Sequence, residues 1–128
     1  INIGSALFMD ERLFMDVRGR DMITGLPKTI TVASDDVTDA ISAELDGIIQ
    51  AVKNVLHQTP PELSADVIDK GVVMAGGSSL LRNIDKLVNR ATGLSAYVAD
   101  DALFCVAKGT GIALENLESY KRSILATK

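Results

Sequence analysis

The chain has 128 residues, of which 47% are hydrophobic and 23% charged, and its net charge is −4. This length fits one domain or a large piece of one, with enough apolar residues for a hydrophobic core. The acidic balance argues against nucleic acid as a main partner, because phosphate binding needs a basic surface. Cys105 is the only cysteine and His57 the only histidine, which excludes an intramolecular disulfide and argues against a zinc site.

Targeting and membrane segments are not recognisable in the sequence. No apolar run approaches the roughly 20 residues of a membrane helix, and no signal peptide is visible. We therefore expect a soluble, cytosolic protein. The chain opens on Ile1 and enters a patterned stretch at once, so we expect a fragment or a processed chain.

Residues 1–33 contain three strand-like runs. In residues 1–6, 12–19 and 27–33, apolar residues alternate with small or polar ones. Successive strands with no helix between them predict an antiparallel meander. This part also contains an apolar cluster that we assign to the core by default, with a surface covered by another subunit or by the rest of its own chain as the alternative. The cluster consists of Phe8, Met9, Phe14 and Met15.

A long helix is predicted over residues 34–59. Ser34 has a hydroxyl suited to an N-cap, and the two aspartates after it suit the positive end of the helix dipole. Apolar residues then recur at spacings of three and four through about six turns, which is typical of a helix with one buried face. The prolines Pro60 and Pro61 end the helix.

The pattern changes between residues 60 and 118. A short helix over residues 62–69 is followed by a strand at 72–75, a helix at 79–90, a strand at 94–99 and a last helix that ends near residue 117. Strands that alternate with helices predict a parallel α/β layer. The remaining residues, 119–128, form a polar tail that we expect to fray.

A glycine turn joins the first strand of this layer to its helix. Residues 72–81 read VVMAGGSSLL, so Gly76 and Gly77 follow the strand and precede Ser78 and Ser79. Such a turn exposes backbone amides at the edge of a parallel sheet, where open α/β sheets bind ligands. The stretch matches neither the dinucleotide fingerprint nor the phosphate-binding P-loop. From these residues alone, a structural turn and a ligand contact both remain open.

Several blocks along the chain resemble the MreB/Mbl family of bacterial actin-like proteins, which organise rod-shape cell-wall growth. The resemblance runs from residue 1 to about residue 118, and the matching blocks occur in the family's order. They are residues 3–6, 17–20, 25–28, 60–63, 71–87, 92–93 and 98–115.

This resemblance implies an α/β, actin-like ATPase fold of the ribonuclease H-like type, of which the chain is the C-terminal part of domain II. Residues 1–33 would be the β-rich end of subdomain IIB, and residues 34–59 a long connecting helix. Residues 60–118 would be the β-α-β-α part of subdomain IIA, and residues 119–128 a C-terminal tail.

The resemblance also implies that the glycine turn binds a nucleotide. In the family this turn is the adenosine motif, which Gly76, Gly77 and Ser78 match with Ser79 adjacent, although the family more often has Gly-Gly-Gly-Ala. The cofactor would be ATP, with Mg in the intact protein. The family's phosphate loops, catalytic carboxylate and Mg-organising residues lie upstream of Ile1. We therefore expect no catalytic or metal-binding residue in this chain, and no hydrolysis by the fragment alone.

Partners and location also follow from the resemblance. The intact protein would form filaments with itself, lie in the cytoplasm in association with the membrane, and bind the proteins RodZ, MreC and MreD. The family's membrane-inserting segment lies upstream, so this chain is not expected to bind lipid. Two alternatives are a non-catalytic interaction module of the same fold and another actin-fold ATPase, such as an Hsp70-like chaperone.

The remaining candidate residues have structural interpretations that we prefer to chemical ones. The acidic pair Asp100 and Asp101 precedes a helix, so N-capping explains it better than acid–base chemistry does. Cys105 lies on an apolar face with no histidine nearby in sequence, which favours a buried thiol over a nucleophile. His57 suits the C-terminal carbonyls of the long helix.

Overall fold

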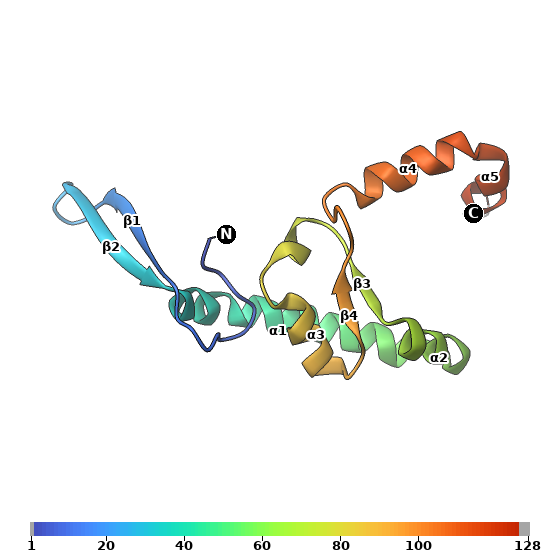
Figure 1. Ribbon diagram of the computed structural model, residues 1–128, viewed down its shortest axis with the longest axis horizontal. Helices are drawn as coiled ribbons and strands as arrows, with labels where there is room; N and C mark the ends of the chain where they lie inside the picture. The colour runs from blue at the N-terminus through green and yellow to red at the C-terminus, as the bar shows by residue number, and fades with distance from the viewer. Residues whose placement is uncertain (1, 126–128) are drawn as a thin grey trace.

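The computed structural model describes the backbone of residues 2–125 and the side chains of residues 2–121. The molecule is elongated, and helix α1 (Ser34–Gln58) runs along much of its length (Figure 1). A β-hairpin extends from one end of α1. Helices α4 (Cys105–Glu115) and α5 (Leu117–Leu125) lie toward the other end. Within residues 2–125, no helix is both long enough and apolar enough to cross a membrane.

The hairpin consists of β1 (Phe14–Arg20) and β2 (Pro27–Ala33), which pair antiparallel with Phe14 opposite Ala33. This pair confirms the strands predicted at residues 12–19 and 27–33. The third strand predicted at residues 1–6 is wrong, since residues 2–6, which the structure describes, make only one isolated parallel bridge, between Ser5 and Arg82. The predicted meander is therefore a two-stranded hairpin.

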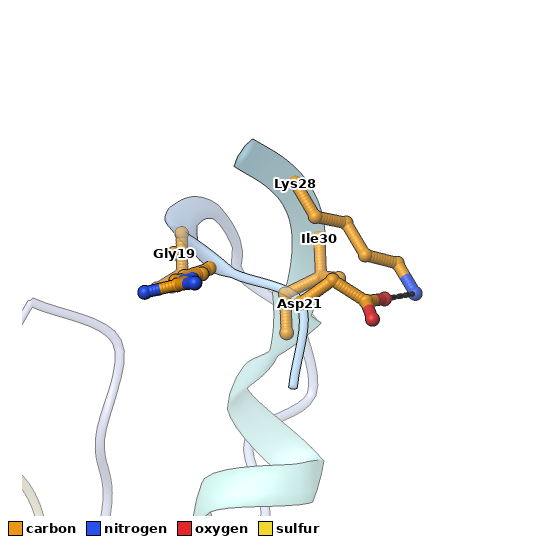
Figure 2. A pocket seen from close by; sticks show the side chains of 6 residues that line it. Gly19, Asp21, Lys28 and Ile30 are labelled. Atoms are coloured by element: carbon orange, nitrogen blue, oxygen red, sulfur yellow. Dashed lines mark hydrogen bonds and ion pairs between the residues drawn. The ribbon is translucent and has the colours of Figure 1, made fainter. Parts of the chain in front are cut away.

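The hairpin loop is held together by the carboxylate of Asp21. One oxygen accepts hydrogen bonds from the amides of Ile23 (2.9 Å) and Thr24 (3.0 Å), and the other lies 3.1 Å from the Lys28 ammonium (Figure 2). The Thr24 amide, the Lys28 side chain and the Ile23 amide, in that order, stabilise the charged form. They lower the pKa of Asp21 from 3.8 to about 2.

The N-cap of helix α1 lies one residue earlier than predicted. Ala33 is the N-cap, and its amide donates to the carboxylate of Asp36 at 2.9 Å. Ser34 lies inside the helix and is buried, and its Oγ accepts a hydrogen bond from the amide of Leu13 at 3.2 Å. The predicted N-cap at Ser34 is therefore wrong, because this hydroxyl holds the base of the hairpin. The predicted extent of the helix is confirmed to within a residue.

A small α/β layer follows α1, as predicted. Helix α2 (Pro61–Lys70) leads into β3 (Val72–Met74), and a 3₁₀ turn η1 (Gly77–Leu80) and α3 (Ile84–Thr92) connect β3 to β4 (Ala96–Val98). Strands β3 and β4 are parallel, with Val72 opposite Ala96. The core joins this layer to α1 through Ala6, Leu45 and Ile84.

Three predictions for the second half of the chain are wrong in detail. The helix predicted over residues 79–90 is interrupted, because Leu81 is extended and Asn83 is left-handed at φ 60°. The aspartates predicted to cap the last helix precede Phe104, which is the N-cap of α4, and Asp101 instead pairs with Lys108. Part of the tail expected to fray is helix α5, while residues 126–128 lie outside the described residues.

Two of the four residues in the apolar cluster of the N-terminal part, Phe8 and Phe14, are exposed, whereas Met9 and Met15 are half-buried. Phe8 and Phe14 are 63% and 64% exposed, so the core interpretation is wrong for both. Cys105 is half-buried rather than buried, with its Sγ 3.7 Å from the carbonyl oxygens of Asp100 and Asp101. His57 lies in the last turn of α1, at the position predicted for it.

Candidate functional site

The glycine turn lies where β3 ends, and its first glycine has a backbone conformation that side chains disfavour. Gly76 has φ 89° and ψ 172°, a region that is accessible almost only to glycine. Its amide donates to the carbonyl of Ala102 at 2.8 Å. The sharp turn away from β3 thus requires glycine at this position and is tied to the segment that follows β4.

The two serines of the turn differ in orientation. Ser79 is 6% exposed, and its Oγ donates to the carbonyl of Gly76 at 2.6 Å while its amide reaches the same oxygen at 3.2 Å. Ser78 is exposed. The Ser79 amide is the first in the turn to donate to a carbonyl of the turn. The amides of Gly77 and Ser78 come before it and are not used by the internal hydrogen bonds of η1. Ser79 closes the turn, and Ser78 faces outward.

The segment after β4 forms the opposite side of the site. The amide of Ala99 donates to the carbonyl of Met74 at 2.9 Å, so the chain leaving β4 stays beside the end of β3. A Cβ placed on Gly77 would lie 3.4 Å from Cδ2 of Leu103. The carboxyl ends of the two parallel strands therefore meet at one edge, which is where α/β sheets bind ligands.

A cleft of about 400 Å³ opens at this edge, a volume within the range of small-molecule sites. Its lining residues are Gly4, Gly77, Ser78, Leu80, Leu81, Arg82 and Leu103. Of the four residues predicted from the sequence, Gly77 and Ser78 line the cleft, whereas Gly76 and Ser79 shape the turn behind them.

Three residues that line the cleft lie outside the glycine stretch and were not predicted from the sequence. Leu103 follows β4 by five positions, and the rule that parallel strand ends meet at one edge could have indicated it. Gly4 comes from a segment far away in sequence, and no local pattern points to it. Arg82 was read as part of a helix and instead lies in the loop before α3.

The chemistry of the lining suits binding rather than proton transfer. Backbone and aliphatic groups form most of the cleft, Ser78 adds a hydroxyl, and Arg82 brings a positive charge. The Arg82 guanidinium lies 3.7 Å from the sulfur of Met9 and is exposed. Within residues 2–125, no three His, Cys, Asp or Glu side chains gather in a way that could hold a metal ion. The cleft thus offers a surface for an uncharged ring system beside a cation.

A larger hollow of about 480 Å³ lies between α1, α2 and the start of β3. It is lined almost wholly by aliphatic groups, among them Val52, Val55, Leu56 and Val67. Ligand sites combine apolar walls with a few convergent polar groups. The cleft at the glycine turn has such groups, so we assign the candidate site there.

Comparison with known proteins identifies the family. The sequence matches the family model described as MreB/Mbl protein over residues 1–122. The chain belongs to the MreB/Mbl family. It is 48% identical over 111 residues to the cell shape-determining protein Mbl of Bacillus cereus and 43% identical over 118 residues to the cell shape-determining protein MreB of Escherichia coli. These alignments cover 87% and 92% of the chain but 33% and 34% of the relatives.

Solved MreB structures share the fold. MreB5 of Spiroplasma citri bound to ADP matches with a TM-score of 0.84 and 34% identity, over 95% of this chain and 36% of that one. The same protein bound to AMPPNP matches with a TM-score of 0.83 and 32% identity. The predicted actin-like α/β fold is confirmed, and the chain spans about a third of the length of the MreB/Mbl relatives it matches.

Proposed function

We propose that the chain is the C-terminal part of an actin-like, ATP-binding protein that forms filaments and determines bacterial cell shape. The observation that carries this proposal is the fold match to MreB5 structures bound to ADP and AMPPNP, together with membership of the family. The relatives in Bacillus cereus and Escherichia coli are cell shape-determining proteins, and this role is proposed here for the intact protein.

The cleft has the features that a nucleotide needs on its adenosine side. Gly77 carries no Cβ, so a ligand can approach its backbone, and Leu103 offers an apolar surface across the turn. The guanidinium of Arg82 suits an anionic ligand. We keep Gly77 and Ser78 as the proposed contacts and Gly76 as the glycine that shapes the turn behind them. The Ser79 hydroxyl is assigned to the turn itself, because it is buried and already donates to the carbonyl of Gly76.

This segment would form one wall of a two-walled cleft. We propose that residues 1–33 belong to subdomain IIB and residues 60–118 to subdomain IIA. The parts of an MreB/Mbl chain that this segment does not cover would hold the phosphates and Mg. Positioning groups on both sides of a reacting phosphate are what hydrolysis requires. ATP hydrolysis is therefore proposed for the intact protein and not for the segment alone.

Self-assembly and cellular partners are proposed on the same family basis. Filaments of the intact protein would lie in the cytoplasm along the membrane, and RodZ, MreC and MreD are the proposed partners. Membrane contact would come from segments outside this chain.

The test is titration of the full-length protein containing this sequence with fluorescently labelled ATP. We expect saturable binding that Gly77→Asp abolishes, because a carboxylate would stand in the cleft and repel the phosphates. Gly109→Asp is the control, since Gly109 lies in α4 with nothing within 4 Å of an added Cβ. Absence of binding in the unmutated protein would favour the non-catalytic alternative, and binding unaffected by Gly77→Asp would count against a nucleotide site at this turn. Sedimentation with and without ATP tests filament formation separately.

A further inference from the structure

A buried polar cluster lies directly behind the candidate cleft, and the proposed function does not account for it. Its centre is Ser5, whose side chain is fully buried at 0% exposed. The Ser5 Oγ donates to the carbonyl of Arg82 at 3.3 Å and accepts from the side-chain amide of Asn83 at 2.9 Å and from the amide of Leu7 at 3.3 Å. A serine hydroxyl has one donor and two acceptor positions, so this one is fully used.

The cluster fixes the end of the loop that lines the cleft. The loop of residues 76–82 begins at Gly76, which is tied to Ala102, and ends at Arg82, whose carbonyl also accepts the amide of Ala6 at 2.8 Å. The lining residues of this loop lie between or at these two attachments. The shape of the cleft wall therefore depends on both anchors, and Ser5 belongs to the second.

Asn83 has a backbone conformation that fits this role. It is one of two non-glycine residues with positive φ among the described residues, at φ 60°, and asparagine tolerates this conformation better than most side chains. Its carbonyl accepts the amide of Leu87 at 3.0 Å in the first turn of α3. Asn83 is thus the point at which the loop turns into α3, and its side chain fixes that turn to Ser5.

The cluster also connects the loop to α1. The hydroxyl of Thr38, which is 4% exposed, lies 3.0 Å from the carbonyl of Ser5 and 3.1 Å from the carbonyl of Ser34. Buried hydroxyls with all partners in place specify a single arrangement, since any other arrangement leaves polar atoms unsatisfied. The loop is therefore held to Ser5 by hydrogen bonds that span 77 and 78 residues of sequence, and Ser5 is held to α1 by the Thr38 hydroxyl.

We propose that Ser5 and Asn83 are positioning residues, whose mutual hydrogen bond holds the loop of residues 76–82 in the conformation that receives a nucleotide. This inference rests on the proposed nucleotide site. Neither side chain needs to touch the ligand, because each acts through the backbone of Arg82 and the residues before it.

The test uses the full-length protein and the variant Asn83→Gly. Glycine adopts φ 60° without strain, so this change removes the side-chain amide and preserves the turn. Asn89→Ala is the matched control, because Asn89 also lies in the α3 region and makes one comparable side-chain hydrogen bond, to the carbonyl of Leu94 at 2.8 Å. Both variants lose one hydrogen bond, but only Asn83 adjoins the cleft.

Two quantities are measured: the dissociation constant of fluorescent ADP, and the hydrogen-exchange rate of the amides of residues 76–82 without nucleotide. We expect Asn83→Gly to raise the dissociation constant about 5- to 10-fold and to speed loop exchange, with Asn89→Ala changing neither. The double variant Ser5→Ala/Asn83→Gly should lose less binding free energy than the two single variants lose together, because the two residues share one hydrogen bond.

The positioning role is overturned if Asn83→Gly binds ADP like the unmutated protein, whatever its thermal stability. It is also overturned if Asn89→Ala weakens binding as much, because the effect would then be one of general stability. Failure of the unmutated protein to bind nucleotide would reject the proposed function instead. In that case the loop exchange rate decides the role of the cluster, and an unchanged rate in Asn83→Gly rejects it.

Discussion

Replacing Gly77 by alanine separates the two roles that a glycine turn can have. Gly77 lies in the 3₁₀ turn without the positive φ of its neighbour, so alanine can adopt its backbone conformation. The nearest atom to an added Cβ is Cδ2 of Leu103 at 3.4 Å, an ordinary van der Waals distance, and Leu103 is 60% exposed and free to shift. The backbone conformation of the turn requires glycine at residue 76, whose φ is positive, but not at residue 77.

The expected magnitudes follow from this geometry. At a compatible backbone, Gly77→Ala should leave the free energy of unfolding unchanged or raise it by about 0.4–1 kcal/mol, because alanine restricts the unfolded chain. The methyl group would lie between Gly77 and Leu103, both of which line the cleft. If a bound nucleotide packs against the backbone of Gly77, the methyl group takes part of the space that the nucleotide needs. Overpacking of this kind costs about 1–3 kcal/mol, so the dissociation constant for nucleotide should rise roughly 5- to 150-fold.

Two assays on the same protein decide the matter. Urea unfolding followed by circular dichroism gives stability, and titration with fluorescent ATP gives the dissociation constant. The control is Gly109→Ala, a helical position with nothing within 4 Å of an added Cβ, which should leave binding unchanged. Wild-type affinity in Gly77→Ala would show that no ligand packs against this glycine. A marked loss of stability would show that the turn itself needs glycine at residue 77.

Three further predictions concern the fold outside the site. Gly71→Ala should destabilise the fold by several kcal/mol in urea unfolding, on the order of the cost of strained backbone plus overpacking, because its Cβ would lie 2.5 Å from the carbonyl oxygen of Ser95 at φ 77°. Leu45→Ala should cost about 2–5 kcal/mol in the same assay, since Leu45 is 7% exposed in the core. Because the pKa of Asp21 is lowered to about 2, its stabilisation of the hairpin loop is present above about pH 4 and lost as pH falls toward 2. A fall in the protection of the Thr24 amide, relative to its intrinsic exchange rate at each pH, that is absent in Asp21→Asn checks this. Protection that does not change with pH contradicts it.

Local patterns in the sequence predicted the elements that depend on neighbouring residues. The hairpin strands alternate in period two, and α1 carries an apolar stripe that the prolines after it terminate. The parallel pair β3 and β4 follows from the order strand, helix, strand, since a crossover through a helix returns to the same sheet. In these cases the interactions that decide the structure lie within about 30 residues.

The errors occur where a distant partner decides the conformation. The apolar spacing from Leu80 to Val88 fits one helix, yet the chain breaks at Asn83 because Arg82 pairs with the N-terminal segment. The same pairing draws residues 2–6 away from the hairpin, so the predicted third strand has no place in it. Asp101 is an exception to this rule, since it forms an ion pair with Lys108, seven residues away, rather than a cap. None of these contacts leaves a periodic or compositional signal.

The glycine turn combines both kinds of information. Gly76 and Gly77 were recognisable as a turn after a strand, but the residues alone left a structural role and a ligand role open. What makes the turn part of a cleft is its attachment to Ala102 at one end and to Ser5 and Ala6 at the other. Without these two attachments, the same residues would not form the wall of a cleft. Local reasoning cannot see those anchors, so the ligand role was indicated only by the family resemblance.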